Sequence, residues 1–287
     1  MDALRGPFRA TEALDSGALT RYRLKTEFHA LHRNVYLHKD EPLTAVNRAV
    51  AAWLWSDRQA IVAGRSAAAL LGSKWIDDDL PAEIIRSSRD KAQGIVVRSD
   101  VLGDDDITVR SGITLTTPAR TAYDIGRRLS LTEALIHLDA LARATGLEGK
   151  NVDHIAEQHK GARGIVPLRR ALQLMDAGSE SPYETRTRLV LLIAGLPRPS
   201  TQIVVKAYGE FVARIDMGWN QWRVGVEFDG AQHWTDPVQR TRDIDRLAEL
   251  EALGWRIIRV SATLLRQRPS VMVARVVEAL RAAGAPV

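Results

Sequence analysis

The sequence predicts a chain of the α/β class, α+β overall. We expect an N-terminal winged helix-turn-helix, a helical and short-strand region, and a C-terminal α/β sandwich with a mixed sheet. Three observations support this prediction. The 287 residues suffice for more than one compact domain, and 45% of them are apolar. The N-terminal part follows the order helix, tight glycine turn, helix, strand. The C-terminal part follows the order αβββαβα.

Residues 1–80 form the first predicted domain, a winged helix-turn-helix-like module. Apolar residues recur at helical spacing, and Gly17 and Gly72 stand where helices are expected to end. The predicted elements are helices at 9–16, 20–28, 43–57 and 66–71 and a strand at 35–38. Two short helices, a tight turn and a following strand are typical of winged helix-turn-helix folds.

Residues 81–178 form a connecting region in which short strands precede a helical layer. Turn residues separate the runs that predict strands, at 82–86, 94–98, 107–110 and 113–116. Thr117-Pro118 opens a helix in which Arg120 and Asp124, four residues apart, predict an ion pair. A capping box at 130–133 opens the next helix. Helices are expected at 131–144, 151–159 and 165–176.

Residues 179–287 form the third predicted domain, which follows a small, polar, turn-prone stretch. Its predicted elements are a helix at 183–194, strands at 201–206, 211–217 and 222–228, a helix at 239–253, a strand at 255–260 and a helix at 270–283. This order is typical of an α/β sandwich with helices on a mixed sheet.

The composition limits the chemistry and the location of the protein. There is no cysteine, so disulfides, thiol nucleophiles and thiolate metal sites are excluded. A metal must therefore be held by oxygen ligands or histidine, which favours magnesium or manganese. No apolar run is long enough to cross a bilayer and no secretory signal opens the chain, so we expect a cytoplasmic protein without a membrane partner. The net charge of +5 is a weak indication of a polyanionic partner.

Three carboxylates of the C-terminal domain are predicted to lie close together. Glu227 and Asp229 are two residues apart on a strand and therefore point to the same face. If strands 211–217 and 222–228 form a hairpin, Asp216 lies near Glu227. Neighbouring carboxylates repel one another, and a divalent cation removes this conflict. Such a cation also lowers the pKa of a bound water and neutralises charge on a phosphoryl oxygen. We expect these three residues to bind a metal ion.

The stretch from residue 181 to 262 resembles the very-short-patch-repair-like, PD-(D/E)xK type of nuclease domain. Five blocks occur in the order of that family: Ser181-Pro-Tyr-Glu184-Thr-Arg, Arg214-Ile-Asp216, Val226-Glu-Phe-Asp-Gly-Ala-Gln-His233, Arg242-Asp243 and Gly254-Trp-Arg-Ile-Ile-Arg-Val. The resemblance implies a restriction-endonuclease-like sandwich that hydrolyses DNA phosphodiesters. It also implies Glu184 on the first helix, and Asp216 and Glu227 as ligands of Mg²⁺ or Mn²⁺.

One position departs from the general pattern of this nuclease type. A lysine usually follows the acidic ligand by two residues and orients or activates the attacking water, but Asp229 stands there. Asp229 can hold the metal or its water instead, and His233 can assist, so the general base stays open. The predicted catalytic residues are Glu184, Asp216, Glu227, Asp229 and His233.

Each of these residues also has a structural interpretation. Glu184 stands at the third position of a helix that opens with serine, as in a capping box. Asp229 precedes a glycine, as in common turns, and His233 can be a hydrogen-bonded surface residue. A carboxylate such as Asp216 on an apolar strand is costly when unpaired. Arg214 is its candidate ion-pair partner.

The N-terminal module carries an excess of basic side chains in its second predicted helix and the segment after it. Glu27 is the single acidic residue between positions 17 and 38. A helix of this kind can enter a major groove and contact phosphates or base edges. The predicted DNA-binding residues are Thr20, Arg21, Arg23, Lys25 and Arg33. The alternatives are a module for protein contacts and a solvated charged face.

The N-terminal region resembles the N-terminal domain of AbiEi-like antitoxins of type IV toxin–antitoxin systems. The blocks that carry this resemblance are Glu12-Ala-Leu-Asp-Ser-Gly-Ala-Leu-Thr20, Arg33-Asn-Val-Tyr-Leu37, Gly64-Arg-Ser-Ala-Ala-Ala-Leu-Leu-Gly72 and Thr116-Thr-Pro-Ala-Arg-Thr-Ala-Tyr-Asp124. The resemblance implies a winged-helix DNA-binding module followed by a helical and short-strand region. It makes a cognate toxin a candidate partner.

Three functions follow from these patterns. The preferred hypothesis is a protein that binds double-stranded DNA and hydrolyses its phosphodiesters with a Mg²⁺- or Mn²⁺-dependent endonuclease-type domain. We expect no small-molecule cofactor. The alternative is a non-catalytic transcription regulator or AbiEi-like antitoxin whose nuclease-like fold only grips DNA, and the lysine replaced by Asp229 supports this alternative. A weaker third hypothesis is a protein-interaction scaffold.

Overall fold

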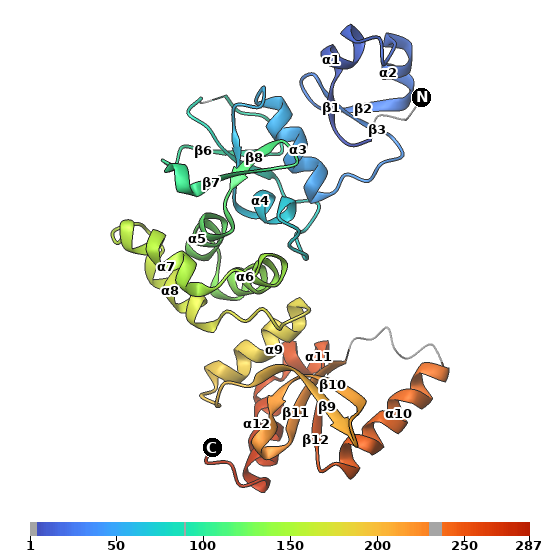
Figure 1. Cartoon of the computed structure of the whole chain (residues 1–287), viewed down its shortest axis with the longest axis vertical. Helices are drawn as coiled ribbons and strands as arrows, with labels where there is room; N and C mark the ends of the chain where they lie inside the picture. The colour runs from blue at the N-terminus through green and yellow to red at the C-terminus, as the bar shows by residue number, and fades with distance from the viewer. Residues whose placement is uncertain (1–4, 89, 230–236) are drawn as a thin grey trace. The chain divides into compact units, whose positions relative to one another are not determined.

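The computed structural model describes residues 5–88, 90–229 and 237–287, without the side chains of 237–241. The chain divides into two compact units, Met1–Met175 and Asp176–Val287, which are described separately below. Both units combine helices with sheets, so the predicted α+β class is confirmed (Figure 1).

The first unit begins with two short helices and a small antiparallel sheet. The elements are β1 (Phe8–Arg9), α1 (Ala10–Asp15), α2 (Arg21–Glu27), β2 (Phe28–His32) and β3 (Val35–His38), and the strand order is β1-β3-β2. Thr20 caps α2, because its hydroxyl oxygen accepts the N–H of Arg23 at 3.3 Å. Helix, turn, helix and β-hairpin follow one another as expected for a winged helix-turn-helix. Strand β2 was not predicted, because it follows α2 without an intervening turn residue.

The middle of the first unit is a five-stranded mixed sheet of order β6-β5-β4-β8-β7. Its elements and flanking helices are α3 (Ala45–Trp55), β4 (Ile61–Val62), α4 (Gly64–Leu70), β5 (Ala82–Ile85), β6 (Ile95–Arg98), a 3₁₀ turn η1 (Asp104–Asp106), β7 (Ile107–Arg110) and β8 (Ile113–Thr116). The central strand β4 has only two residues, which is too short to give a pattern in the sequence. It pairs antiparallel with β5 and parallel with β8.

A helical layer completes the first unit, as predicted. It comprises α5 (Pro118–Arg128), α6 (Leu131–Thr145), α7 (Gly149–Gln158) and α8 (Ile165–Leu174). Leu115 of the sheet and Tyr123, Leu138 and Leu168 of the helices are buried in one core. The expected ion pair is present inside this layer, where Arg120 Nε lies 3.2 Å from Asp124 Oδ2.

The second unit is a four-stranded mixed sheet with helices on both faces. Its elements are α9 (Pro182–Ile193), β9 (Ser200–Ala207), β10 (Glu210–Trp219), a 3₁₀ turn η2 (Asn220–Trp222), β11 (Val224–Asp229), α10 (Pro237–Ala252), β12 (Arg256–Ser261), α11 (Ala262–Gln267) and α12 (Pro269–Ala282). The strand order is β12-β11-β10-β9, with β11 and β12 parallel and the other pairs antiparallel. The short helix α11 was not predicted.

Two hydrophobic cores lie on the two faces of this sheet. Helices α9, α11 and α12 pack on one face around buried residues such as Met217, Val226 and Met272. Helix α10 packs on the other face, where Leu250 meets Ile215. Strand β10 contributes to both cores, with Ile215 in the core under α10 and Met217 in the opposite one, whereas Val224 and Val226 of β11 belong only to the latter.

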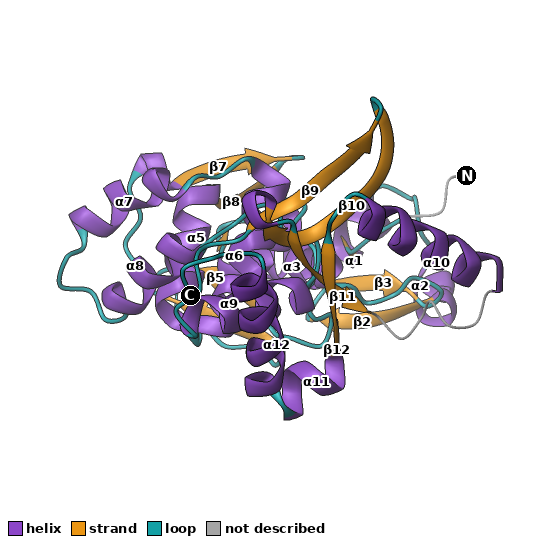
Figure 2. Ribbon diagram, turned by 90° about the horizontal axis from the view of Figure 1, so that it is seen from below, coloured by secondary structure: helices purple, strands orange, loops and turns teal. Residues whose placement is uncertain are grey.

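Strand β10 pairs with its two neighbours over different lengths, and this difference creates the site. Pairing with β11 extends only from Trp219 to Met217, whereas pairing with β9 continues to Glu210. Beyond Met217, β9 and β10 therefore form a two-stranded ribbon that leaves the rest of the sheet (Figure 2). The opening between β10 and β11 is called the fork below.

Candidate active site

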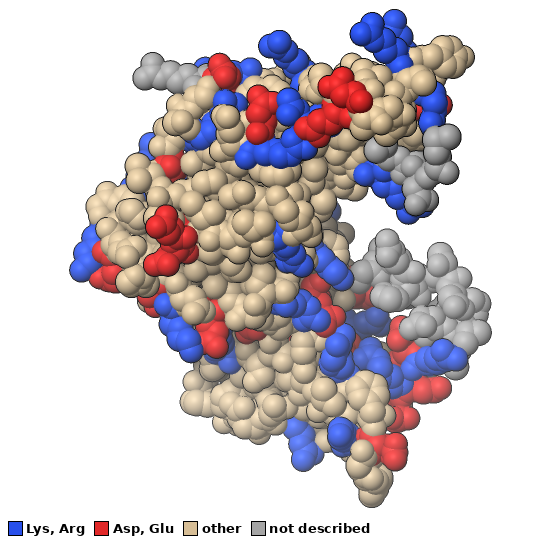
Figure 3. All heavy atoms as spheres, turned by 45° about the horizontal axis from the view of Figure 1, so that its top comes forward, with Lys and Arg blue, Asp and Glu red and all other residues tan. Residues whose placement is uncertain are grey.

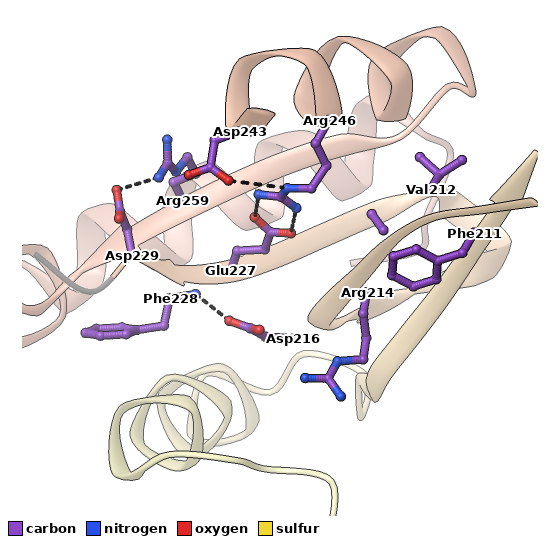
Figure 4. A pocket seen from close by; sticks show the side chains of 11 residues that line it. Phe211, Val212, Arg214, Asp216, Glu227, Phe228, Asp229, Asp243, Arg246 and Arg259 are labelled. Atoms are coloured by element: carbon purple, nitrogen blue, oxygen red, sulfur yellow. Dashed lines mark hydrogen bonds and ion pairs between the residues drawn. The ribbon is translucent and has the colours of Figure 1, made fainter. Parts of the chain in front are cut away.

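A polar pocket of about 250 Å³ lies in the fork between β10 and β11. Side chains from the ribbon, from β11, from α10 and from β12 converge on it (Figure 4). The lining residues are Phe211, Val212, Ala213, Arg214, Asp216, Glu227, Phe228, Asp229, Asp243, Arg246 and Arg259. Three of the five predicted catalytic residues therefore line one pocket, and they come from two strands that are adjacent in the sheet.

Asp216 lies at the base of the fork, one step beyond the last pair of β10 and β11. Its Oδ2 accepts the N–H of Phe228 at 2.8 Å. Burial raises the pKa of this carboxyl to about 7, and the neighbouring carboxylates of Glu184, Glu227 and Glu180 add to the increase. The hydrogen bond from Phe228 opposes these effects only in part. A negative charge on Asp216 is therefore unfavourable unless a cation compensates it.

Glu227 faces helix α10 and is held by an arginine. Its two oxygens accept from Arg246, Oε1 from Nη1 at 2.7 Å and Oε2 from Nη2 at 3.0 Å. Glu227 is buried, and Arg246 also lies near Asp243 on the same helix. The carboxylate raises the pKa of the Arg246 guanidinium, mainly through this hydrogen bond. Part of the predicted repulsion between carboxylates is thus removed by an arginine.

Asp229 points to the same face of β11 as Glu227, as the alternation along the strand predicts. Its Oδ2 lies 2.8 Å from Nη2 of Arg259, the residue of β12 that pairs with Glu227 in the sheet. Its other oxygen, Oδ1, is buried and has no hydrogen-bond partner in the described part of the chain. Within the described residues, that oxygen is therefore a buried polar atom whose hydrogen-bonding capacity is unfilled.

Glu184 is buried at the start of α9 and combines a structural role with proximity to Asp216. Ser181 Oγ accepts its N–H at 3.1 Å, which is one half of the expected capping box. Its carboxylate reaches back to the N–H of Glu180 at 2.9 Å and accepts from Gln202 Nε2 at 3.2 Å. The same carboxylate still raises the pKa of Asp216.

The remaining predictions for this site have different outcomes. His233 lies outside the described residues. Arg214 does not pair with Asp216 but with Glu180, at 2.9 Å. The arginines that neutralise the site, Arg246 and Arg259, were not among the predicted residues. A signal for Arg246 was available, since it follows Asp243 by three residues on a helix and therefore shares its face.

The side chains of this pocket are chemically suited to bind a metal ion, but they are not arranged to bind one. Burial and the nearby carboxylates of Glu184, Glu227 and Glu180 raise the pKa of Asp216, and carboxylate oxygens are the hard ligands that divalent cations such as Mg²⁺ prefer. No group of three histidine, aspartate or glutamate side chains among the described residues is arranged to hold a metal ion. Glu227 and Asp229 are each oriented toward an arginine instead. Glu227 must turn from Arg246 before it can share an ion with Asp216.

The predicted DNA-binding residues lie on α2 and the β2–β3 turn of the first unit. Arg23 is engaged by Glu27, with Nη2 and Oε2 2.7 Å apart. Arg21, Lys25 and Arg33 are exposed and make no ion pair within the described part of the chain. On the face that Figure 3 shows, basic and acidic side chains are interspersed over much of the surface. The three exposed cations are therefore the strongest candidates for phosphate contacts in this module.

Two protein families match successive segments of the chain, in the same order as the two resemblances seen in the sequence. A restriction-endonuclease-like family, REase_MTES_1575, matches residues 198–280. The AbiEi antitoxin C-terminal domain matches residues 75–176. The chain thus carries an AbiEi-antitoxin-type segment followed by a restriction-endonuclease-like domain. The antitoxin match covers the block that ends at Asp124 and is to the C-terminal domain of these antitoxins, whereas the expected resemblance was to their N-terminal domain. The blocks before residue 75 lie outside the match.

Two curated relatives come from Mycobacterium tuberculosis: "Uncharacterized protein MT2308" of strain CDC 1551 / Oshkosh and "Uncharacterized protein Rv2248" of strain ATCC 25618 / H37Rv. Each is 32% identical over 166 residues, which is 58% of this chain and 61% of the relative. The aligned part thus covers about three fifths of the relatives' own length. No solved structure is significantly similar to the chain. None of the described helices is both long and apolar enough to span a membrane.

Proposed function

We propose that the protein is a DNA endonuclease whose reaction depends on a divalent cation at Asp216. The observation that carries this proposal is the buried carboxyl of Asp216: burial raises its pKa to about 7, and the nearby carboxylates of Glu184 and Glu227 add to the increase. Asp216 accepts one backbone hydrogen bond, from Phe228, but makes no ion pair with a cationic side chain in the described part of the chain, and a buried carboxylate with so little compensation is costly. The match of residues 198–280 to a restriction-endonuclease-like family supports the same reaction class.

Each residue of the fork has a different proposed role in phosphodiester hydrolysis. Asp216 and Glu227 would hold Mg²⁺ or Mn²⁺, which activates a water and neutralises phosphoryl charge when bound. Arg246 neutralises the charge of Glu227 in this structure. Its planar guanidinium can bind a phosphate oxygen as well as a carboxylate. Asp229, whose buried Oδ1 has no hydrogen-bond partner among the described residues, can accept a proton or orient a water molecule. Glu184 maintains the negative potential at Asp216.

The N-terminal module is proposed to bring duplex DNA to this domain. Arg21, Lys25 and Arg33 would contact phosphates, and the N-terminal end of α2, capped by Thr20, would favour an anion. These contacts position DNA without defining its sequence, so the base preference of the enzyme is a separate question from its affinity.

Cleavage by the purified protein tests the proposal. We expect cutting of supercoiled, nicked or mismatched DNA with Mg²⁺ or Mn²⁺, none with chelator, and none by Glu227→Ala. Glu249→Ala is the matched control, because Glu249 is an exposed acid on α10 away from the pocket. Activity that survives in Glu227→Ala would belong to a contaminant. Absence of cleavage on every substrate with either metal would contradict the proposal.

A second candidate function is that of a DNA-binding antitoxin or transcription regulator with a cognate toxin as partner. The match of residues 75–176 to the AbiEi antitoxin C-terminal domain favours it. This function predicts promoter binding that is unchanged by chelator and by Asp216→Ala, together with no cleavage of any DNA. A chelator-sensitive complex would argue against it.

A further inference from the structure

The β9–β10 ribbon has one buried face and one exposed face. Ile203, Val205, Ala213 and Ile215 are buried on the face that packs toward α10. The opposite face is formed by two apolar and two cationic side chains that are exposed, and we call it the ribbon face: Val204, Lys206, Phe211 and Arg214. Leaving an aromatic ring and a β-branched side chain in water has no benefit for folding, so this face is a candidate for binding.

A β-bulge places Phe211 on the ribbon face. The pairing register shifts between Phe211 and Ala213, so that Val212 is the extra residue of β10. Val212 and Ala213 both lie on the less exposed side, whereas Phe211 pairs with Lys206 and shares the exposed side with Arg214. In a regular strand Phe211, two residues before Ala213, would share the buried side with Ala213, because side chains alternate along a strand. The bulge thus turns an aromatic ring outward, next to the pocket of the fork.

Large hydrophobic side chains at this end of the ribbon are exposed to solvent. Phe211 is 65% exposed and Val204 is 53% exposed, and Tyr208 in the turn at the tip is fully exposed. Phe211 also lines the pocket that contains Asp216 and Glu227 (Figure 4). Phe211 and Asp216 are five residues apart, which corresponds to roughly 15 Å of strand. A ligand lying on the ribbon face can therefore continue directly into the fork.

The chemistry of the ribbon face fits a single strand of nucleic acid. Lys206 and Arg214 flank the ring and supply positive charge for phosphates, although Arg214 also contacts Glu180. An exposed aromatic side chain among cations stacks on bases whose faces are free. In a duplex those faces are covered by neighbouring bases, so Phe211 could contact only the sugar-phosphate backbone of the DNA. Aromatic rings on an exposed sheet face are a recurrent way to bind unpaired bases.

We propose that the ribbon face binds unpaired DNA, with Phe211 stacking on a base and Lys206 and Arg214 contacting the adjacent phosphates. The inference rests on the proposed nuclease function and defines its substrate class, which is DNA with a single-stranded segment beside the scissile bond. A flap, a gap or a locally opened duplex meets this description. Fully paired DNA would be bound by the N-terminal module but would leave the ribbon face unused.

Base stacking in the absence of cleavage tests this proposal. The probe is a single-stranded oligonucleotide with one 2-aminopurine, whose fluorescence falls when the base stacks, titrated with the full chain in chelator. We expect saturable quenching, weakened about tenfold by Phe211→Ala and retained by Phe211→Trp. Ile193→Ala is the matched control, because Ile193 is exposed to a similar extent in the same unit but lies off the ribbon.

The outcomes separate this proposal from the nuclease assignment. Binding that depends on Phe211 without any metal-dependent cleavage would retain the ribbon face and reject the nuclease. Metal-dependent cleavage, together with binding that Phe211→Ala leaves unchanged, would retain the nuclease and reject the ribbon-face proposal. The ribbon-face proposal is also overturned if a matched duplex shows the same dependence on Phe211. It is overturned as well if Phe211→Ala dissociates a dimer in sedimentation, because a second copy would then occupy the face.

Discussion

Arg246 holds both carboxylate oxygens of Glu227, at 2.7 and 3.0 Å, in the pocket that also contains Asp216. The pair joins α10 to β11 at the edge of the fork. It places a positive charge where the sequence alone predicts a divalent cation. The same geometry therefore stabilises the resting protein and marks the position that a metal or a phosphate would compete for.

Removal of Arg246 is expected to destabilise the second unit. Arg246→Ala leaves Glu227 buried without its partner, which should lower the free energy of unfolding by about 3 kcal/mol. Denaturant unfolding measures this loss. Arg242→Ala, on the exposed side of the same helix, should change stability by less than about 0.5 kcal/mol. If Arg246→Ala and Glu227→Gln were additive in the double variant, the pair would not be energetically coupled.

The raised pKa of Asp216 makes the second unit less stable at high pH. Below its ordinary value of 3.8 the carboxyl is neutral in both the folded and the unfolded state. Between that value and about 7 only the unfolded state is ionised, so stability falls as pH rises through this range. Asp216→Asn should therefore gain about 2–4 kcal/mol over the unaltered protein in alkaline buffer, and little in acid.

The measurement for Asp216 is the midpoint of denaturation as a function of pH in both proteins. Saturating Mn²⁺ should raise the midpoint of the unaltered protein in alkaline buffer and leave Asp216→Asn unchanged. Parallel pH profiles for the two proteins would show that Asp216 ionises at an ordinary pKa, and the electrostatic basis of the site would be lost.

The first unit depends on a buried ion network around Asp124. The side chain of Asp124 is fully buried and contacts Arg120 at 3.2 Å and Arg128 at 3.0 Å. Asp124→Ala should lower the stability of the first unit by about 3–5 kcal/mol, because two arginines lose their shared partner. Glu157→Ala, which removes an exposed acid, should cause no measurable change. Calorimetry should show that only one of two unfolding transitions moves; a shift of both would mean that the units unfold together.

Salt dependence tests the proposed DNA contacts of the N-terminal module. Arg21→Ala and Lys25→Ala should each weaken duplex binding and reduce the slope of log K against log salt by about 1. Arg23→Ala should have a smaller effect, because Glu27 already engages that guanidinium. Fluorescence anisotropy over a salt series gives these slopes. Equal slopes in all variants would assign duplex binding to another surface.

The fold was largely predictable from periodicity and turn residues. Elements longer than about six residues with clear caps, such as α5 behind Thr117-Pro118, were located within a residue or two. Strands β1, β2 and β4 were missed. Two of them have only two residues, and β2 follows a helix without a turn, so none has a pattern that local sequence can reveal.

The acidic residues of the candidate site could be predicted from the sequence, but its two arginines could not. Two-residue spacing on a strand placed Glu227 and Asp229 on one face, and hairpin pairing brought Asp216 near them. Arg246 and Arg259 reach the site from α10 and β12, and their placement depends on how a helix and a parallel strand pack. Spacing links Arg246 to Asp243 on one helix face, but a single sequence does not show that this face lies over β11.

Direct binding of Mn²⁺ tests the central claim of the account. Calorimetric titration at a pH above the pKa of Asp216 should show saturable binding that is lost in both Asp216→Asn and Glu227→Gln and preserved in Glu249→Ala. Heat of binding that is unchanged in Asp216→Asn, or no binding to the unaltered protein, would show that the fork does not hold a cation. The carboxylates would then serve only the ion pairs with Arg246 and Arg259.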